Sequence, residues 1–160
     1  MENFSCNSSR LVKLITISTF TLLILVAFVL IFVEGRLGAA SGILFLVVVM
    51  GSAFYFYAQS LKRLIITDTQ LILKKNLGKI IIDFEDIDSV VKLKYADIPM
   101  VIGSKGVFGF LGKTMDGSIS YVKNRKNMVH IITADKKYLV SCDARDAFVQ
   151  KLREKITVQQ

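Results

Sequence analysis

A glycine-rich stretch holds the residues of this chain that come nearest to a known chemical motif. Gly112-Lys113-Thr114 matches the end of a phosphate-binding loop, whose backbone amides and lysine hold nucleotide phosphates. That motif needs another glycine at the position of Val107, and Gly106 is one residue out of register. No strand-helix-strand pattern surrounds it. We therefore expect a glycine-rich turn or bulge instead of a nucleotide site.

The same stretch contributes to a candidate anion-binding surface. Residues 61–160 carry 18 Lys and Arg against 11 Asp and Glu, so +7 of the total net charge of +8 lies there. If the fold brings the basic residues near the glycine-rich loop to one face, that face would attract lipid headgroups or an acidic partner. Ordinary solvated charge is the alternative. The candidate basic residues are Lys105, Lys113, Lys123, Arg125 and Lys126, and the loop residues are Gly103, Gly106, Phe108, Gly109, Phe110 and Gly112.

The aromatic residues of this loop could pack in a core or meet a membrane, and core packing is the preferred interpretation. Other reactive residue types are scattered. His130 has no Cys, Asp or Glu at metal-ligand spacing, and we interpret it as a strand residue. Cys6 and Cys142 form no metal or redox motif; Cys6 is interpreted as a small residue, with acylation as the alternative. We therefore predict no enzyme, no metal and no cofactor.

Two uncharged apolar runs decide where the chain is located. Leu14 to Val33 and Leu37 to Ala58 are 20 and 22 residues long, and about 20 apolar residues cross a bilayer. The three residues between them, 34–36, can only fold the second helix back beside the first. We predict an N-terminal tail over residues 1–13, a two-helix membrane hairpin over 14–60 and one domain over 61–160.

Charge beside the two runs predicts their orientation. Arg10 and Lys13 precede the first run, and Lys62 and Arg63 follow the second. Because Lys and Arg favour the cytoplasmic side, both termini are predicted to be cytoplasmic. Gly38 and Gly42 are spaced for close helix packing, either within the hairpin, which we prefer, or in a homodimer.

Beyond the hairpin, short β-type runs alternate with turn residues. Ala96 to Gly117 is expected to be a loop. Phe148, Leu152 and Ile156 recur at the spacing of one helix face, with Asp143 as a candidate cap. The predicted strands are Leu64 to Thr67, Gln70 to Lys74, Lys79 to Phe84, Val90 to Tyr95, Ser118 to Lys123, Met128 to Thr133 and Tyr138 to Ser141.

Several of these segments resemble the bacterial pleckstrin-homology (PH) domain family. The resemblance rests on Phe84-Glu85-Asp86-Ile87, the run from Gly103 to Lys113, Lys126-Asn127-Met128-Val129 and the closing helix. It covers Leu61 to Ile156 and implies a seven-stranded bent β-barrel capped by a C-terminal α-helix. It also implies a binding scaffold without catalysis. The first β-hairpin lacks the basic pattern of PH domains that bind phosphoinositides, so that specific ligand is not expected.

These observations predict an integral membrane binding or scaffold protein of the bacterial inner membrane. Its PH-like domain would bind a partner protein or the anionic membrane surface, and a homo-oligomer is left open. The alternative is a small regulatory subunit of a membrane transport or envelope-stress complex. No ionisable residue lies within either apolar run, which disfavours transport by this chain alone. Nucleic acid is not expected as a partner, because the basic residues are scattered and Trp is absent.

Overall fold

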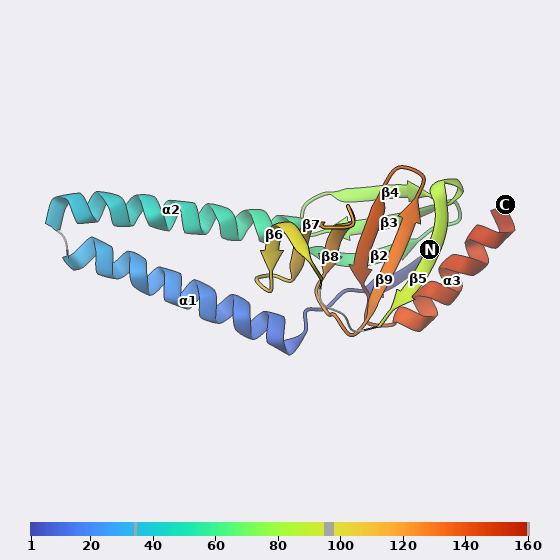
Figure 1. Cartoon of the computed structure of the whole chain (residues 1–160), viewed down its shortest axis with the longest axis horizontal. Coiled ribbons are helices and arrows are strands. Elements are labelled where there is room, and N and C mark those ends of the chain that lie inside the picture. Colours follow the sequence, from blue (N-terminus) through green and yellow to red (C-terminus); the bar gives the residue numbers. More distant parts are fainter. Residues whose placement is uncertain (34, 95–97, 160) are drawn as a thin grey trace.

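The computed structural model of the chain describes residues 1–33, 35–94 and 98–159. A long pair of helices extends from one end of a β-rich domain (Figure 1). The helices of the pair are α1 (Arg10–Val33) and α2 (Gly35–Gln59), and a third helix, α3 (Arg145–Gln159), closes the chain. Glu34 of the predicted connector and Tyr95 of a predicted strand lie outside the described residues.

Helices α1 and α2 are long enough to cross a membrane and lie side by side. Only 6% and 11% of their most apolar windows are buried within the protein, so neither is the core helix of a soluble domain. Helix α1 begins earlier than the predicted span because Ser9 caps it. The Ser9 hydroxyl accepts a hydrogen bond from the amide of Val12 at 3.3 Å.

The glycines of α2 differ in what they face. A Cβ added to Gly42 would lie 2.5 Å from Cγ1 of Ile31 and 3.1 Å from the carbonyl oxygen of Ala27, both on α1. A Cβ added to Gly51 would meet nothing within 4 Å. Gly42 therefore lets the two helices of one chain approach closely, in agreement with the preferred interpretation of its spacing.

This contrast gives a matched pair of variants. Gly42→Leu should force the helices apart and destabilise the hairpin by about 1–3 kcal/mol, the usual cost of overpacking. Gly51→Leu adds the same side chain to an open surface and should leave stability unchanged. Thermal unfolding of the full chain in detergent micelles, followed by its helical circular dichroism, would measure both. Equal losses in the two variants would contradict the packing role of Gly42.

The β-rich domain contains two sheets. The first is antiparallel, with its strands in the order β1-β2-β3-β4, and the second has the order β5-β9-β10-β8-β7-β6. Within the second sheet β8 and β10 are parallel. The strands are β1 (Glu2–Ser5), β2 (Leu61–Ile66), β3 (Gln70–Lys75), β4 (Lys79–Asp83), β5 (Ile87–Leu93), β6 (Met100–Lys105), β7 (Phe110–Thr114), β8 (Ile119–Val122), β9 (Met128–Thr133) and β10 (Lys137–Ser141).

Two apolar helices followed by a PH-like β domain with a C-terminal helix confirm the predicted fold class, although the strands are more numerous than the seven expected. Strands β6 and β7 replace part of the loop predicted from Ala96 to Gly117. Gly103 pairs with Gly112 across this hairpin, and both have positive φ. A Cβ on Gly103 would lie 2.0 Å from the carbonyl oxygen of Leu111. These glycines let the two strand backbones approach closely without ending the strands.

The residues ahead of the first span, expected as part of a tail, contain strand β1. It pairs with β2, with Glu2 opposite Ile66 and Ser5 opposite Arg63. The ring of Phe4 lies edge-on to Phe148, with centroids 5.3 Å apart. The helix pair is therefore inserted between two neighbouring strands of one sheet, and both chain termini lie in the domain (Figure 1).

Helix α3 covers the main core of the domain. Phe148 and Leu152 are fully buried with Phe84, which lies in the short 3-10 turn η1 (Phe84–Asp86). The guanidinium of Arg153 donates to the carbonyl of Val90 on β5 at 2.6 Å. Asp143, a candidate cap for α3, instead accepts a 2.7 Å hydrogen bond from the side-chain amide of Asn7. It thus fastens the N-terminal segment to the start of α3.

Candidate functional site

The end of α2 joins the domain without a linker, since Ser60 alone separates it from β2. The turn between β3 and β4 binds the last carbonyls of the helix. The amide of Leu77 donates to Ala58 at 3.0 Å, and the side-chain amide of Asn76 donates to Tyr57 at 2.9 Å. Because the last carbonyls of a helix lack partners within the helix, this turn completes α2 and fixes its direction.

The turn between β6 and β7 binds the other helix. The amide of Phe108 donates to the hydroxyl of Thr16 at 2.8 Å, and that hydroxyl donates to the carbonyl of Val12 at 2.7 Å. The Phe108 ring lies 5.7 Å from the ring of Phe20 on α1 and 6.3 Å from that of Tyr57 on α2. Phe108 has a φ of +57°, which is uncommon for a side chain of this size. The strained residue thus contacts both helices.

The predicted loop residues lie in two environments, the core of the domain and the surface of the helices. Phe110 and Leu111 are buried in the domain, in agreement with core packing, whereas Phe108 packs on the helices. Gly106 lies against Ile15 of α1, and a Cβ on Gly109 would lie 2.5 Å from the carbonyl oxygen of Val122. The phosphate-loop-like sequence at 112–114 is part of strand β7.

Two of the five candidate basic residues make contacts that support the fold. The Lys123 ammonium donates to the carbonyl of Leu61 at 2.9 Å, and the Lys123 carbonyl accepts from the amide of Ser9 at 3.1 Å. Burial lowers the pKa of Lys123. The guanidinium carbon of Arg125 lies 5.0 Å from the centre of the Phe110 ring. Lys123 therefore ties together the two points at which the chain enters and leaves the helix pair.

The other three candidates have exposed side chains. Lys105 ends β6, next to the turn that binds α1, and Lys113 lies on β7 among the residues that line a cavity beside α2. Lys126 lies in the turn between β8 and β9, where its carbonyl accepts from Arg145 at 3.4 Å. The structure thus brings Lys105 and Lys123 to the ends of the helices, with Arg125 and Lys126 in an adjoining turn and Lys113 on the far side of the cavity.

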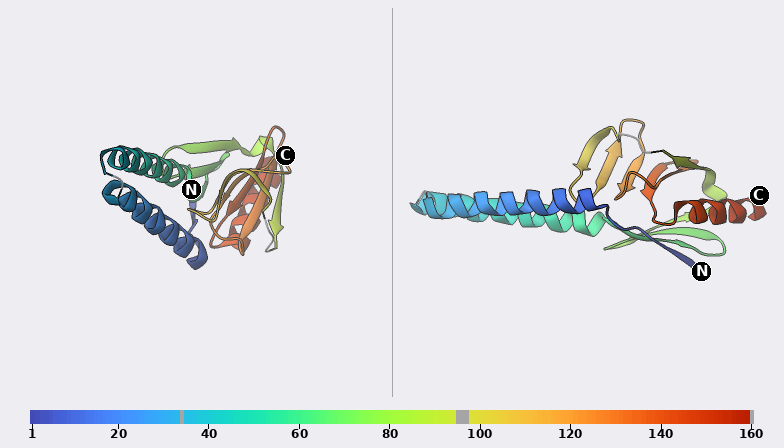
Figure 2. Two further views of the ribbon diagram at one scale, coloured as in Figure 1. Left: turned by 60° about the vertical axis from the view of Figure 1, so that its left-hand side comes forward. Right: turned by 90° about the horizontal axis from the view of Figure 1, so that it is seen from below.

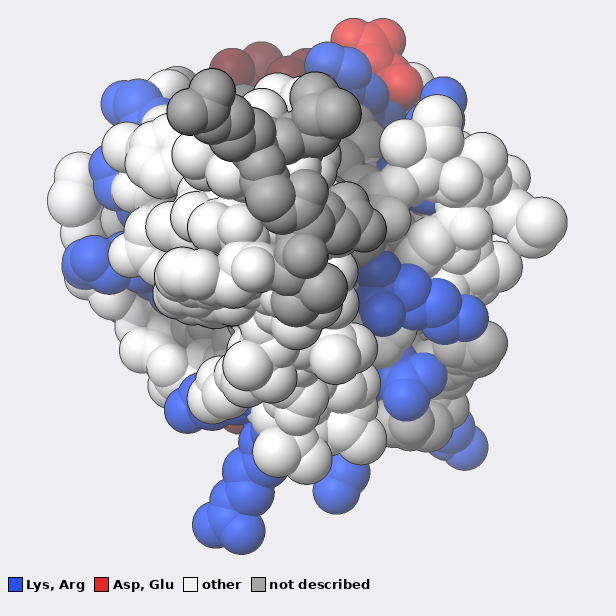
Figure 3. Space-filling model, turned by 90° about the vertical axis from the view of Figure 1, so that its left-hand side faces the viewer, with Lys and Arg blue, Asp and Glu red and all other residues white. Residues whose placement is uncertain are grey.

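Two further exposed residues, which the sequence did not single out as binding residues, lie near the end of α2. Leu77, at the turn that caps α2, is 54% exposed, and Lys79, two residues further on, is also exposed. Viewed along the helices, Lys and Arg side chains surround the apolar helix pair (Figure 3). We call this surface the helix-end face, and define it by Lys62, Leu77, Lys79, Lys105, Val107, Phe108 and Lys123. In the sequence, the signal for this face is an apolar residue within a turn, Leu77, followed two residues later by Lys79.

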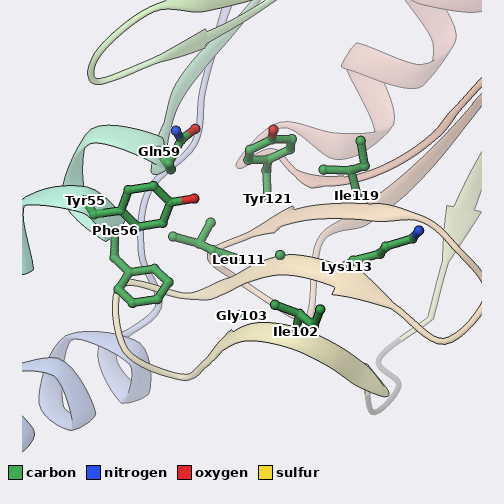
Figure 4. Close-up of a pocket in the computed structure, with 10 residues that line it drawn as sticks. Tyr55, Phe56, Gln59, Ile102, Gly103, Leu111, Lys113, Ile119 and Tyr121 are labelled. Atoms are coloured by element: carbon green, nitrogen blue, oxygen red, sulfur yellow. The ribbon is translucent and has the colours of Figure 1, made fainter. Parts of the chain in front are cut away.

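A cavity of about 430 Å³ opens beside this face, between the last turns of α2 and the strands β6, β7 and β8 (Figure 4). Its lining mixes apolar and polar side chains. Strand β6 runs across the helix axis beside the end of α2 in both ribbon views (Figures 1 and 2). The cavity is lined by Tyr55, Phe56 and Gln59 of α2, Ile102 of β6, and Leu111 and Lys113 of β7, among others.

A second polar cluster joins Asp116, Ser118 and His130. The Ser118 hydroxyl donates to Asp116 Oδ2 at 2.7 Å and lies 3.1 Å from His130 Nε2. Hydrogen bonds, first that from Thr114, lower the pKa of Asp116 to about 2, and burial lowers the pKa of His130. In a serine hydrolase the serine hydroxyl donates its proton to the histidine. Here the Ser118 hydroxyl donates its hydrogen bond to the Asp116 carboxylate instead. The cluster therefore ties the β7–β8 turn to β9 and does not activate a nucleophile.

The thiols of Cys6 and Cys142 are both buried, and burial raises the pKa of each, that of Cys142 to about 11. Cys6 is thus a packed core residue rather than a presented acylation site. Over residues 1–33, 35–94 and 98–159, no three His, Cys, Asp or Glu side chains group as a metal site requires. The helix-end face and the cavity beside α2 are therefore the two features of the described residues that suit binding.

Comparison with known proteins supports this interpretation. The family described as the bacterial PH domain matches residues 62–156, which is more than half of the chain. The match covers the domain from β2 to α3 and leaves out β1 and the helix pair. No curated protein and no solved structure matches the chain. The resemblance predicted from the sequence is confirmed.

Proposed function

Because the chain belongs to the bacterial PH domain family, we propose that it is an integral membrane binding protein whose domain rests on the anionic surface of the bacterial inner membrane. PH domains are typically binding modules and not enzymes. In this proposal the hairpin anchors the module, and the helix-end face contacts lipid headgroups.

The exposed helix surfaces support insertion into a bilayer. Large apolar side chains, such as Leu14, Phe32 and Leu44, project from the helix pair. Leaving such surface in water costs about 25 cal/mol per Å². A bilayer removes this cost, and helices of this length match its thickness.

Charge and topology support a cytoplasmic domain. The start of α1 and the end of α2 lie at the domain, as do strand β1 and helix α3 near the two chain termini (Figure 1). Arg10 and Lys13 stand beside one helix end, and Lys62 and Arg63 beside the other. Since such residues favour the cytoplasm, the domain and both termini would be inside.

The single observation that carries the proposal is that turns of the domain bind the start of α1 and the end of α2. Phe108 contacts Phe20, which lies about 10 Å along α1 from Lys13 at 1.5 Å per residue. A ring at that depth would reach the interfacial region of the bilayer. The exposed lysines Lys62, Lys79 and Lys105 would then face anionic headgroups, each worth about 1 kcal/mol near the surface.

The absence of Trp from the chain makes this contact measurable. Single Leu77→Trp and Val107→Trp variants of the full chain, reconstituted into bilayers, each carry one tryptophan. We expect blue-shifted emission and strong quenching by bromine-labelled lipids, because both positions lie on the helix-end face.

Lys136→Trp is the matched control, since Lys136 lies in the turn between β9 and β10, away from the helices. Its fluorescence should be insensitive to the brominated lipids. Equal and weak quenching at all three positions would mean that the domain stands away from the bilayer, and would overturn the proposal.

A further inference from the structure

We infer that the cavity between α2 and the β6–β7 hairpin binds one anionic phospholipid from the surrounding bilayer. The inference rests on the proposed placement of the helix-end face at the membrane. It goes further by assigning a site of defined shape and one class of ligand.

The position of the cavity selects a lipid as its occupant. Tyr55 and Phe56, which line it, lie in the last two turns of α2, and strand β6 runs beside them across the helix axis. In a membrane-inserted chain these turns lie at the bilayer interface, where tyrosine is commonly found. A cavity at that depth opens toward lipid molecules and not toward bulk solvent alone.

The lining combines apolar side chains with hydrogen-bonding groups, which suits a phospholipid with its acyl chains and polar headgroup. Phe56, Ile102 and Leu111 supply apolar surface, and Ile102 is 71% exposed. Gln59 and the phenols of Tyr55 and Tyr121 supply hydrogen-bonding groups (Figure 4). The volume of about 430 Å³ falls within the range of about 300–1,000 Å³ of ligand sites. It would hold part of a phospholipid and leave the rest of its chains in the bilayer.

The charge at the cavity selects an anionic headgroup. Lys113 lies on β7 at the side of the lining farthest from α2, with its ammonium directed away from Tyr55 and Phe56 (Figure 4). Within the described part of the chain this ammonium makes no ion pair. A phosphodiester is the anion that a bilayer supplies in quantity, and Lys binds phosphate as a point charge. Phosphatidylcholine carries the same phosphate beside a cationic group, so a lipid with net negative charge should bind more tightly.

Gly103 and Gly112 form part of the strand wall of the cavity. They face one another across β6 and β7 and both line the cavity. A Cβ on either glycine would lie about 2 Å from a carbonyl oxygen of the partner strand, so the glycines let the two strands that form this wall approach closely.

Native mass spectrometry of the delipidated full chain, with phosphatidylglycerol or phosphatidylcholine added in micelles, tests the site. The expected result is a one-to-one adduct that forms preferentially with phosphatidylglycerol. Lys113→Gln should weaken this adduct about fivefold, in proportion to the loss of one near-surface charge. Ile102→Trp should fill the cavity and weaken the adducts of both lipids.

Two exposed neighbours serve as controls. Val101→Trp places the same side chain one residue away, at a position that is 59% exposed and outside the lining. Lys136→Gln removes a charge from the turn between β9 and β10. Both should bind phosphatidylglycerol as the unmodified chain does. Unchanged binding by Lys113→Gln and Ile102→Trp, or equal losses in the controls, would overturn the inference.

The outcome can be separated from that of the proposed function. Leu77 and Val107, the positions of the tryptophan probes, do not line the cavity. Quenching of those probes without a preferential adduct would reject the lipid site and keep the membrane contact. Absence of quenching would reject the membrane contact itself.

Discussion

Replacing Phe148 by alanine is expected to lower the free energy of unfolding of the domain by about 3–5 kcal/mol, the usual effect of deleting a buried aromatic ring. Phe148 is fully buried on α3, within the cluster that joins the two sheets. The loss is comparable with the total stability of a small domain, which is about 5–15 kcal/mol. Denaturant unfolding of the full chain in micelles, followed by near-ultraviolet circular dichroism, would measure it.

Gln150→Ala is the matched control, because Gln150 lies on the exposed side of the same helix. It should change the unfolding free energy by less than about 0.5 kcal/mol. A double-mutant cycle with Phe4→Ala should give a coupling of about 0.5–1.5 kcal/mol, since the two rings meet edge-on at 5.3 Å. If Phe148→Ala cost no more than Gln150→Ala, the packing of α3 described above would be wrong.

The second large effect concerns the N-terminal strand. A chain in which residues 8–60 are replaced by a four-residue Gly/Ser linker should fold as a soluble domain, whereas residues 61–160 alone should not. The amide of Cys6 donates to the carbonyl of Lys62 at 3.3 Å, so a short linker can join the strands β1 and β2. Without β1, the edge of β2 and the ring of Phe148 lose their partners.

Nuclear magnetic resonance and denaturant unfolding of the two soluble chains would decide between these outcomes. The linked chain should give dispersed amide signals and one cooperative transition. The shorter fragment should give collapsed signals, because the loss of β1 removes the pairing of β2 and the contact between the rings of Phe4 and Phe148, which is a large part of a marginal stability. Equal unfolding midpoints for the two chains would show that β1 is dispensable.

The sequence alone determined the parts of this protein that depend on local composition. Two uninterrupted apolar runs predict membrane helices because crossing a bilayer requires only length and hydrophobicity. Phe148, Leu152 and Ile156 predicted the closing helix because its period is local. The segments around Phe84 and Gly103 identified the PH family, which the match over residues 62–156 confirmed.

Only the tertiary structure decided how these parts join. Strand β1 has a single large apolar side chain, Phe4, and is held by pairing with β2, whose residues follow it after the whole helix pair. Strands β6 and β7 contain glycines typical of a loop, yet the cross-strand pair of Gly103 and Gly112 keeps them in a sheet.

The same holds for the candidate site. Lys123 donates to Leu61, 62 positions away in the chain, so its role was not readable from the basic residues beside it. Likewise Phe108 contacts Phe20 and Tyr57, and the cavity has walls from α2 and from three strands. Contacts between residues far apart in the chain depend on how the elements pack, and composition and spacing along the chain do not record that packing.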